Sequence, residues 1–354
     1  NPGDTNKNGN ATNPTRGNWG GITFEATSDS TSIIKYSVLR YGNTPSVYYG
    51  TWPDGAYTQG QITLINASPT IENDTLSDNV YGVYALFVSK PKINDCVFIN
   101  SQYTPVAMSL SADPVFGGVN SMLNPGLRAL GIIGHNVGAN GTLRQRTFAG
   151  YTNITYVVLE NVTIKSGTVV TIDPGIVVKM NMYTAIWVDG GFVAKGTVGQ
   201  GRVVFSSILD DNVGNPLDTN GDGLATVPAR GNWSTIRFQD TSIDCLCVLD
   251  SADVKYGGGG SSYGAVTFLN ASGNIKNSLL AHSNHFAVRC DGASMPSISN
   301  VTMQDSRLDP IAMSLLSDPV FSAITFDANG TNGIRILEGT LSTSTTLNRR
   351  DVAG

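Results

Sequence analysis

Short segments in which apolar and polar residues alternate run along the chain, and four of them in its second half align with one another. These segments are STIRF (234–238), AVTFLN (265–270), FAVRCD (286–291) and IAMSLL (311–316). Alternation with a period of two gives a β-strand one buried and one solvent-facing side. Strands this short cannot bury their apolar side alone, whereas stacked coils with two or three strands per turn share one continuous core. The pattern therefore predicts a parallel β-solenoid.

A second set of strands is predicted between the first, at DVKYG, NIKNS, SISNVTM and SAITF. The first set recurs after 22 residues from Val266 to Val288 and after 25 residues from Val288 to Met313. This spacing sets the expected length of one coil.

Asparagines recur at the predicted corners of the coils. Asn66 and Asn270 follow the strand in matching coils, and Asn79 and Asn284 fall in matching turns. Asparagine tolerates the left-handed backbone that a sharp corner needs, and its side chain can hydrogen-bond along a stack. An ordinary turn explains any single one equally well, but recurrence at matching places favours solenoid corners.

The chain contains a long internal repeat. DTNKNGNATNPTRGNW from Asp4 recurs as DTNGDGLATVPARGNW from Asp218, and PVAMSLSADPVF from Pro105 recurs as PIAMSLLSDPVF from Pro310. The second pair is separated by fewer residues than the first, which places an insertion in the first copy. The segment PSVYYGTWPDG after Thr44 fits this insertion and predicts a protruding loop.

The repeat divides the chain into two parts. We expect residues 1–150 to be the C-terminal part of one β-helix module. Residues 151–354 are expected to form a second module, in which leader coils (151–214) precede a repeat of 1–150. On this interpretation the chain is a window of a longer array.

The leader carries the most specific resemblance. The segment YVVLENVTIKSGTVVTIDPGIVVKM from Tyr156, followed by GGFVAKGT, the DTNGDG loop and RGNWSTIRF, resembles right-handed parallel β-helix repeat proteins of the prokaryotic cell surface. The resemblance implies an all-β, right-handed parallel β-helix with the fold of the pectate-lyase-like superfamily, in which two homologous segments stack in one rod. That superfamily includes lyases, epimerases, adhesins and surface layers, so the fold leaves the function open.

Composition and charge exclude several classes of protein. Charged residues make up only 14% of the chain, and 40 glycines and 15 prolines favour strands and turns over helices. The net charge is −5 and basic residues do not cluster, so we expect no nucleic-acid partner. No apolar run approaches the roughly 18 residues of a membrane span.

The DTNGDG loop is the strongest candidate site. Asp218, Asn220 and Asp222 offer oxygen ligands at alternate positions, and Gly223 permits a sharp turn, as in calcium-binding loops. The bidentate Glu of an EF-hand is missing, because Ala229 stands at its position. We expect the end of the preceding strand to complete a structural Ca²⁺ site, with a plain solvated turn as the alternative. The added ligands are Asp210 and Asp211, and a weaker site in the first copy would use Asp4, Asn6 and Asn8.

Outward positions of the stacked strands offer a weak carbohydrate-binding face. Arg237, Arg289 and Asp291 are placed to contact an acidic sugar, but no pair of acids accompanies them. The three histidines lie in no nucleophile motif, so we expect no catalytic residues.

The four cysteines are expected to be free, buried thiols. Cys245 and Cys247 are two residues apart on a predicted strand, so they should share one face, where they pair poorly. A disulfide stays open, and no zinc-binding spacing is present.

Several Asn-x-Ser/Thr triplets are candidate glycosylation sites in a host that uses them. They are Asn66, Asn73, Asn140, Asn153, Asn161, Asn232, Asn270, Asn300 and Asn329, together with Asn10.

These observations favour a non-enzymatic structural or adhesive module of an extracellular, cell-surface repeat protein or filament. Its expected partners are neighbouring copies or modules of the same protein and cell-surface polysaccharide. The alternative is a carbohydrate-binding or polysaccharide lyase- or epimerase-like β-helix.

Overall fold

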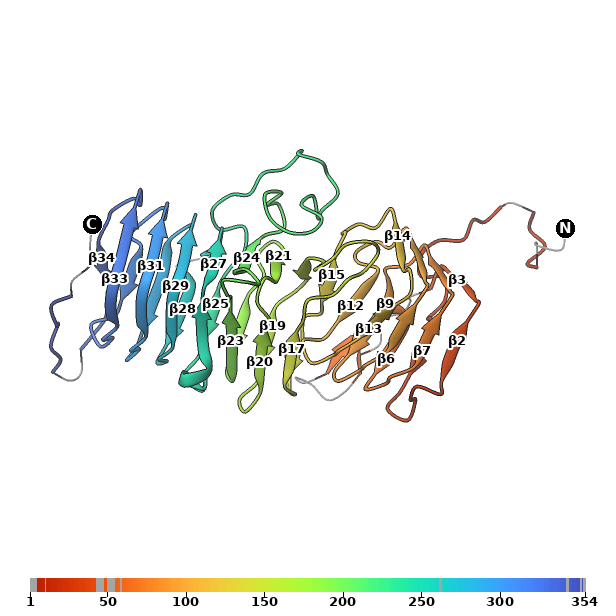
Figure 1. Ribbon diagram of the computed structural model, residues 1–354, viewed down its shortest axis with the longest axis horizontal. Coiled ribbons are helices and arrows are strands. Elements are labelled where there is room, and N and C mark those ends of the chain that lie inside the picture. Colours follow the sequence, from red (N-terminus) through yellow and green to blue (C-terminus); the bar gives the residue numbers. More distant parts are fainter. Residues whose placement is uncertain are drawn as a thin grey trace.

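The computed structural model describes residues 5–9, 11–42, 48–49, 55–57, 59–260, 263–341, 344–350 and 352. It is an all-β parallel solenoid of about 12 turns, so the predicted fold class is confirmed. The coils succeed one another along the long axis in chain order, as the colours of Figure 1 show. The only helical element among the described residues is the short 3₁₀ turn η1 (Asp244–Leu246).

One sheet, called face 1, runs through the whole stack. It joins β1 (Ile22–Phe24), β6 (Gly60–Ile65), β9 (Tyr81–Leu86), β12 (Val106–Met108), β15 (Leu130–Ile132), β18 (Tyr156–Val158), β21 (Val177–Met180), β24 (Val203–Ser207), β27 (Ala252–Lys255) and the second halves of β29 (Asn274–Ala281), β31 (Ser297–Gln304) and β33 (Val320–Asp327). All of these pairings are parallel.

Two further faces complete the coils from β15 onward. Face 2 joins β16 (Asn136–Val137), β19 (Val162–Ile164), β22 (Ile186–Val188), β25 (Ile236–Phe238), β28 (Gly264–Leu269), β30 (Phe286–Asp291), β32 (Ile311–Met313) and β34 (Ile334–Ile336). Face 3 joins β17 (Gly141–Leu143), β20 (Val169–Ile172), β23 (Gly191–Lys195), β26 (Cys247–Asp250) and the first halves of β29, β31 and β33.

The first turns use two separate four-stranded sheets in place of faces 2 and 3. One joins β2 (Ile33–Lys35), β7 (Thr70–Glu72), β10 (Lys92–Asn94) and β13 (Val115–Gly117), and the other joins β3 (Val38–Arg40), β8 (Thr75–Ser77), β11 (Val97–Ile99) and β14 (Ser121–Leu123). The predicted insertion falls largely outside the described residues. Within it, β4 (Tyr48–Tyr49) pairs antiparallel with β5 (Ala56–Tyr57), which follows the insertion directly.

The strands predicted to stack do so in register. Val266 of β28 lies opposite Val288 of β30, and Cys290 of β30 lies opposite Met313 of β32. Their inward side chains join one core of buried apolar residues that runs through both halves of the chain. A second, smaller apolar cluster lies apart from this core and includes Tyr84 of β9 and Val157 of β18.

Residues with a left-handed backbone conformation form corners of the coils. This was expected for four asparagines and holds for two of them. Asn66 and Asn270 have φ of 53° and 49°. Asn79 and Asn284 are not among the positive-φ residues. Asn79 instead donates a hydrogen bond to Gln61 Oε1 at 3.1 Å.

The two copies of the repeated motif make the same local contacts. The indole nitrogen of Trp19 donates to the Arg40 carbonyl at 2.5 Å, and that of Trp233 donates to the Lys255 carbonyl at 2.7 Å. Trp233 is fully buried, whereas Trp19 is half-buried.

Equivalent strands of the two copies nevertheless lie on different faces. The segments ITLINAS (62–68) and VTFLNAS (266–272) match in sequence, but the first begins in β6 on face 1 and the second begins in β28 on face 2. In the sheet order, β24 is seven steps from β1, and the next strand of the chain is β25, the counterpart of β1. One repeat therefore advances the solenoid by seven turns and one face.

Candidate metal site

The long connection between β24 and β25, residues 208–235, contains no strand and projects from the stack as the green loop in Figure 1. Its backbone is tied to two turns of face 1. The Arg128 amide donates to the Thr219 carbonyl at 2.8 Å, and the Thr155 amide donates to the Asn215 carbonyl at 3.0 Å. A long polar loop is thereby fixed against the strands that precede it.

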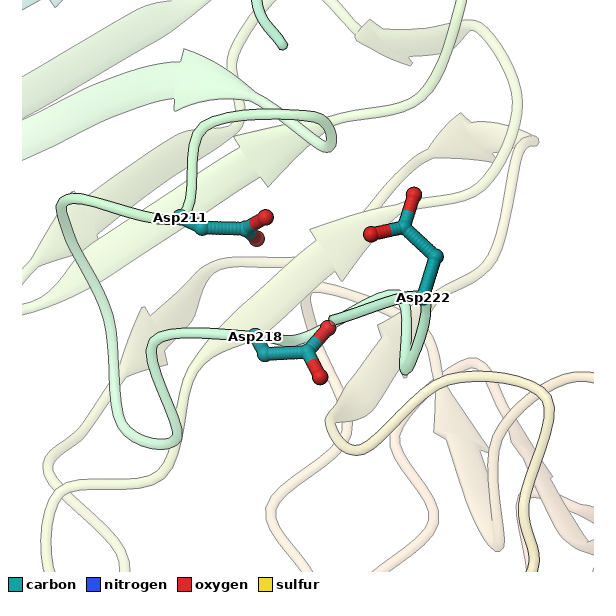
Figure 2. A group of neighbouring side chains, drawn as sticks. All are labelled: Asp211, Asp218 and Asp222. Atoms are coloured by element: carbon teal, nitrogen blue, oxygen red, sulfur yellow. The ribbon is translucent and has the colours of Figure 1, made fainter. Parts of the chain in front are cut away.

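Three carboxylates of this loop converge. Asp211, Asp218 and Asp222 each offer an oxygen, and these oxygens lie within 4.8 Å of one another. Figure 2 shows the carboxylates of Asp211 and Asp222 pointing toward each other, with the carboxylate of Asp218 below them in this view. Three acidic oxygens at this spacing are a suitable ligand set for a hard divalent cation.

The orientation of the oxygens supports a cation. Asp218 Oδ2 accepts hydrogen bonds from the Gly223 amide at 3.1 Å and from Arg128 Nη1 at 3.2 Å. Asp222 Oδ2 accepts from Asn220 Nδ2 at 2.9 Å. The remaining carboxylate oxygens of the cluster are buried and have no hydrogen-bond partner. They are Oδ1 of Asp218, Oδ1 of Asp222 and both oxygens of Asp211. Buried carboxylate oxygens without partners are costly, and a bound Ca²⁺ would remove that cost.

Two predicted ligands have other roles. Asp210 is only 2% exposed and accepts from Ser206 Oγ at 2.5 Å and from the Asn212 amide at 3.2 Å. Asn220 donates from its side-chain nitrogen to Asp222 and to Thr226, and it thereby orients one of the three carboxylates. The sequence spacing identified the loop but not which side chains turn inward.

A buried lysine lies beside the site. Lys179 of β21 is fully buried and donates to the Leu217 carbonyl at 2.7 Å. Burial lowers the pKa of Lys179 to about 8, although the nearby carboxylates oppose this change. Burial also raises the pKa of Asp211, and the neighbouring carboxylates raise it further, against the effect of Lys179. No sequence pattern marked Lys179 as part of the site.

The corresponding loop of the first copy has fewer acids. Asp4 lies outside the described residues, and Asn6 and Asn8 are exposed. Both amides donate to Thr12 Oγ1, at 3.3 and 2.7 Å. The bond from Asn6 matches that from Asn220 to Thr226 Oγ1 at 3.2 Å, so the two loops share this contact, although Asn8 stands in place of the carboxylate of Asp222.

The predicted carbohydrate-binding residues lie on the outer side of face 2. Arg289 Nε donates to Asp291 Oδ1 at 2.8 Å. Arg237 lies two strands away from Arg289, with its guanidinium 5.3 Å from the ring centre of Trp187 and 5.6 Å from that of Tyr263. The sequence analysis did not predict that these rings lie beside Arg237, although Trp187 occupies an outward position of its strand.

The candidate glycosylation sites differ in exposure. Asn232 is buried, and its side-chain oxygen accepts hydrogen bonds from Ser207 Oγ and the Ala229 amide, so the folded chain does not present it. Three others are partly buried, namely Asn73, Asn153 and Asn329, and five are exposed, namely Asn66, Asn140, Asn161, Asn270 and Asn300. Asn10 lies outside the described residues.

The four cysteines are free, as expected, but the expectations that all four are buried and that Cys245 and Cys247 share a strand face are wrong. Cys245 lies in η1 and is exposed, whereas Cys247 lies on β26 and is buried. The two thiols therefore do not share a strand face, because a helical turn begins just before the strand.

A buried Ser–His pair escaped the sequence interpretation. His135 Nε2 lies 2.5 Å from Ser109 Oγ, and His135 Nδ1 lies 2.9 Å from the Asn136 carbonyl. His135 is 7% exposed, and burial lowers its pKa to about 4. The backbone carbonyl and the hydroxyl hold a neutral ring, which identifies the pair as part of the packed structure.

No protein-family model, curated protein or solved structure matches the chain. Among the described residues, no helix has the length and apolar character needed to cross a membrane.

Calcium is expected to stabilise the folded chain. Because the ion would bind the converged carboxylates only in the native state, saturating Ca²⁺ at about 100 times its Kd should add about 2.7 kcal/mol and raise the melting temperature. Asp222→Asn should abolish the rise, whereas the exposed Asp240→Asn should leave it intact. Melting curves that coincide in Ca²⁺ and in EDTA for the unaltered chain would show that the loop is a plain turn.

His135 is expected to make stability fall in acid. Its pKa is depressed on folding, so the unfolded chain binds the proton first, and stability should decline as pH drops from about 6.5 to about 4. The full loss is about 3 kcal/mol. Denaturant unfolding across this range should show a shallower pH dependence in His135→Gln than in the unaltered chain. Equal slopes would contradict a role for this ring.

Proposed function

We propose that the chain is a non-enzymatic structural or adhesive module of an extracellular surface repeat protein, working as a stiff rod segment. The observation that carries the proposal is the unbroken register of face 1 across the boundary between the two copies, where β15 pairs with β12 on one side and with β18 on the other. A rod needs such continuity, since each coil is stabilised mainly by its neighbours.

Several ion pairs on the surface link neighbouring coils, which suits a mechanical role. Lys35 on β2 pairs with Glu72 on β7 at 3.0 Å, and Lys276 on β29 pairs with Asp250 on β26 at 3.4 Å. An exposed ion pair of this kind contributes little to the free energy of folding, but each of these pairs joins one coil to the next. Each of these carboxylates is thus paired with the lysine ammonium group of an adjacent coil.

Calcium has a structural place in this proposal. An ion held by Asp211, Asp218 and Asp222 would fasten the connection 208–235, which already contacts the turns that contain β15 and β18. The ion would supply charge neutralisation, while Arg128 and Lys179 would limit the net negative charge of the site. The loop would then stiffen the rod close to the junction of the two copies.

The resemblance of the leader sequence supports a more specific proposal about the fold family and the kind of protein to which the module belongs. In this proposal the module has the right-handed β-helix of the pectate-lyase-like superfamily and belongs to a prokaryotic surface protein. Its partners are further modules of the same kind and cell-surface polysaccharide, and its exposed sequons carry glycan where the host glycosylates them.

One observation favours the alternative of a carbohydrate-binding or lyase-like β-helix. The guanidinium of Arg237 lies over the rings of Trp187 and Tyr263, and its Nε is buried without a hydrogen-bond partner among the described residues. A guanidinium beside aromatic rings can bind an acidic sugar. Binding without cleavage would fit an adhesive module equally well.

Incubation with acidic polysaccharides distinguishes the two functions. We expect no unsaturated or shortened products, because Arg289 is engaged by Asp291 and no acid pair accompanies Arg237 on this face. Turnover in the unaltered chain that disappears in Arg289→Ala, with the fold retained, would contradict the structural proposal. A heat-denatured sample serves as the blank.

A further inference from the structure

The coil that ends the first copy and the coil that ends the second copy are equivalent in sequence. ALGIIGHNVGANGTLRQRTFAG from Ala129 matches GIRILEGTLSTSTTLNRRDVAG from Gly333. The first of these coils is covered by β18, β19 and β20 of the leader, whereas the second lies at the end of the stack shown in Figure 1. The chain therefore contains two equivalent coils, of which the first is covered by further strands and the second is not.

Three apolar positions record the difference. In the first coil Ile132, Val137 and Leu143 are at most 1% exposed. Their counterparts in the second coil are 39%, 43% and 56% exposed, and these are Ile336, Leu341 and Leu347. Leaving such side chains in water forgoes the free energy that burial would provide.

Each covered position faces a specific apolar partner in the leader. Ile132 lies opposite Val158, and Leu143 lies opposite Ile172. Val137 lies opposite Ile164. The partners come from three consecutive leader strands, so the covering surface has a defined spacing and pattern.

An arginine clamp is built in both coils. Arg146 Nη2 bonds Asp113 Oδ1 at 2.6 Å, and its Nε donates to the Pro114 carbonyl at 3.2 Å. Arg350 makes the same contacts with Asp318 at 2.7 Å and with the Pro319 carbonyl at 3.4 Å. The two guanidiniums are therefore held in the same way.

The clamp of the first coil has one more partner. Arg146 Nη1 donates to the hydroxyl of Tyr156 at 2.6 Å, and that hydroxyl donates to the Arg144 carbonyl at 2.7 Å. Tyr156 is the first residue of β18 and is fully buried. At the second coil Arg350 Nη1 donates to the Asn348 carbonyl at 2.7 Å, and no tyrosine hydroxyl reaches it from the described residues.

We infer that the coil formed by β34, Leu341 and residues 344–350 and 352 is a docking surface for a further leader segment with the pattern of residues 151–207. The incoming tyrosine would bind Arg350, and three apolar strands would cover Ile336, Leu341 and Leu347. This inference rests on the proposed modular rod and names its partner. Because β34 lies on face 2, the added leader would begin one face round from β18.

A fusion tests the inference directly. A second copy of residues 151–207 is joined behind residue 354 of the full chain, and hydrogen exchange is followed at the amides of β34 and of β15. We expect the fusion to slow exchange at β34 about tenfold or more, with β15 unchanged. A fusion of scrambled leader sequence should leave β34 as fast as in the original chain.

Two variants test the clamp within the fusion. Replacing the tyrosine of the added leader, the counterpart of Tyr156, by Phe should remove part of the protection that the added leader gives to β34, and so should Arg350→Gln. The control Arg307→Gln, at an exposed arginine outside this coil, should not. Exchange at β34 that is equally fast with and without the added leader, while β15 stays protected, would overturn the inference and leave the rod proposal standing. Loss of protection at β15 as well would instead count against the rod itself.

Discussion

Every feature of this chain depends on the requirement that successive coils stack in register. Each strand is short, so its inward side chains are buried only when the strands before and after it supply matching apolar residues. The corners must turn at the same place in every coil, which is why left-handed residues such as Asn73 and Asp95 recur at neighbouring corners. Stacking restricts which residue types can occupy the inner positions and the corners of such a solenoid. The loops and the outward side chains are less restricted, so features specific to one protein are found there.

The metal site follows from the one long departure from this regularity. After β24 the chain leaves the ladder for residues 208–235, buries Trp233 near the end of this connection and returns to the ladder at β25. The loop is polar, yet it is fixed to the turns of β15 and β18. Carboxylates brought together in this way repel one another, and their orphaned oxygens are the strongest physical argument for a cation.

The sequence predicted the repeating parts well and the unique contacts poorly. Alternation and spacing were sufficient to align Val266 with Val288, because in-register stacking is a property of the pattern itself. They could not reveal that Asp210 turns toward Ser206 while Asp211 faces the other acids, since adjacent residues of a loop have no fixed period. The pairing of Arg237 with Tyr263 depends on a loop conformation, and the shift of the second copy by one face depends on the geometry of whole coils.

The junction of the two copies decides whether the chain is one rod or two. There the side sheets of the first turns end, faces 2 and 3 begin, and only face 1 continues through β12, β15 and β18. Native-state hydrogen exchange at the amides of Leu130, Ile133 and Leu159 tests this continuity most directly. The account predicts protection equal to that of β28 and β30 in the middle of the second copy. Fast exchange at the junction, with slow exchange on either side, would contradict a continuous rod.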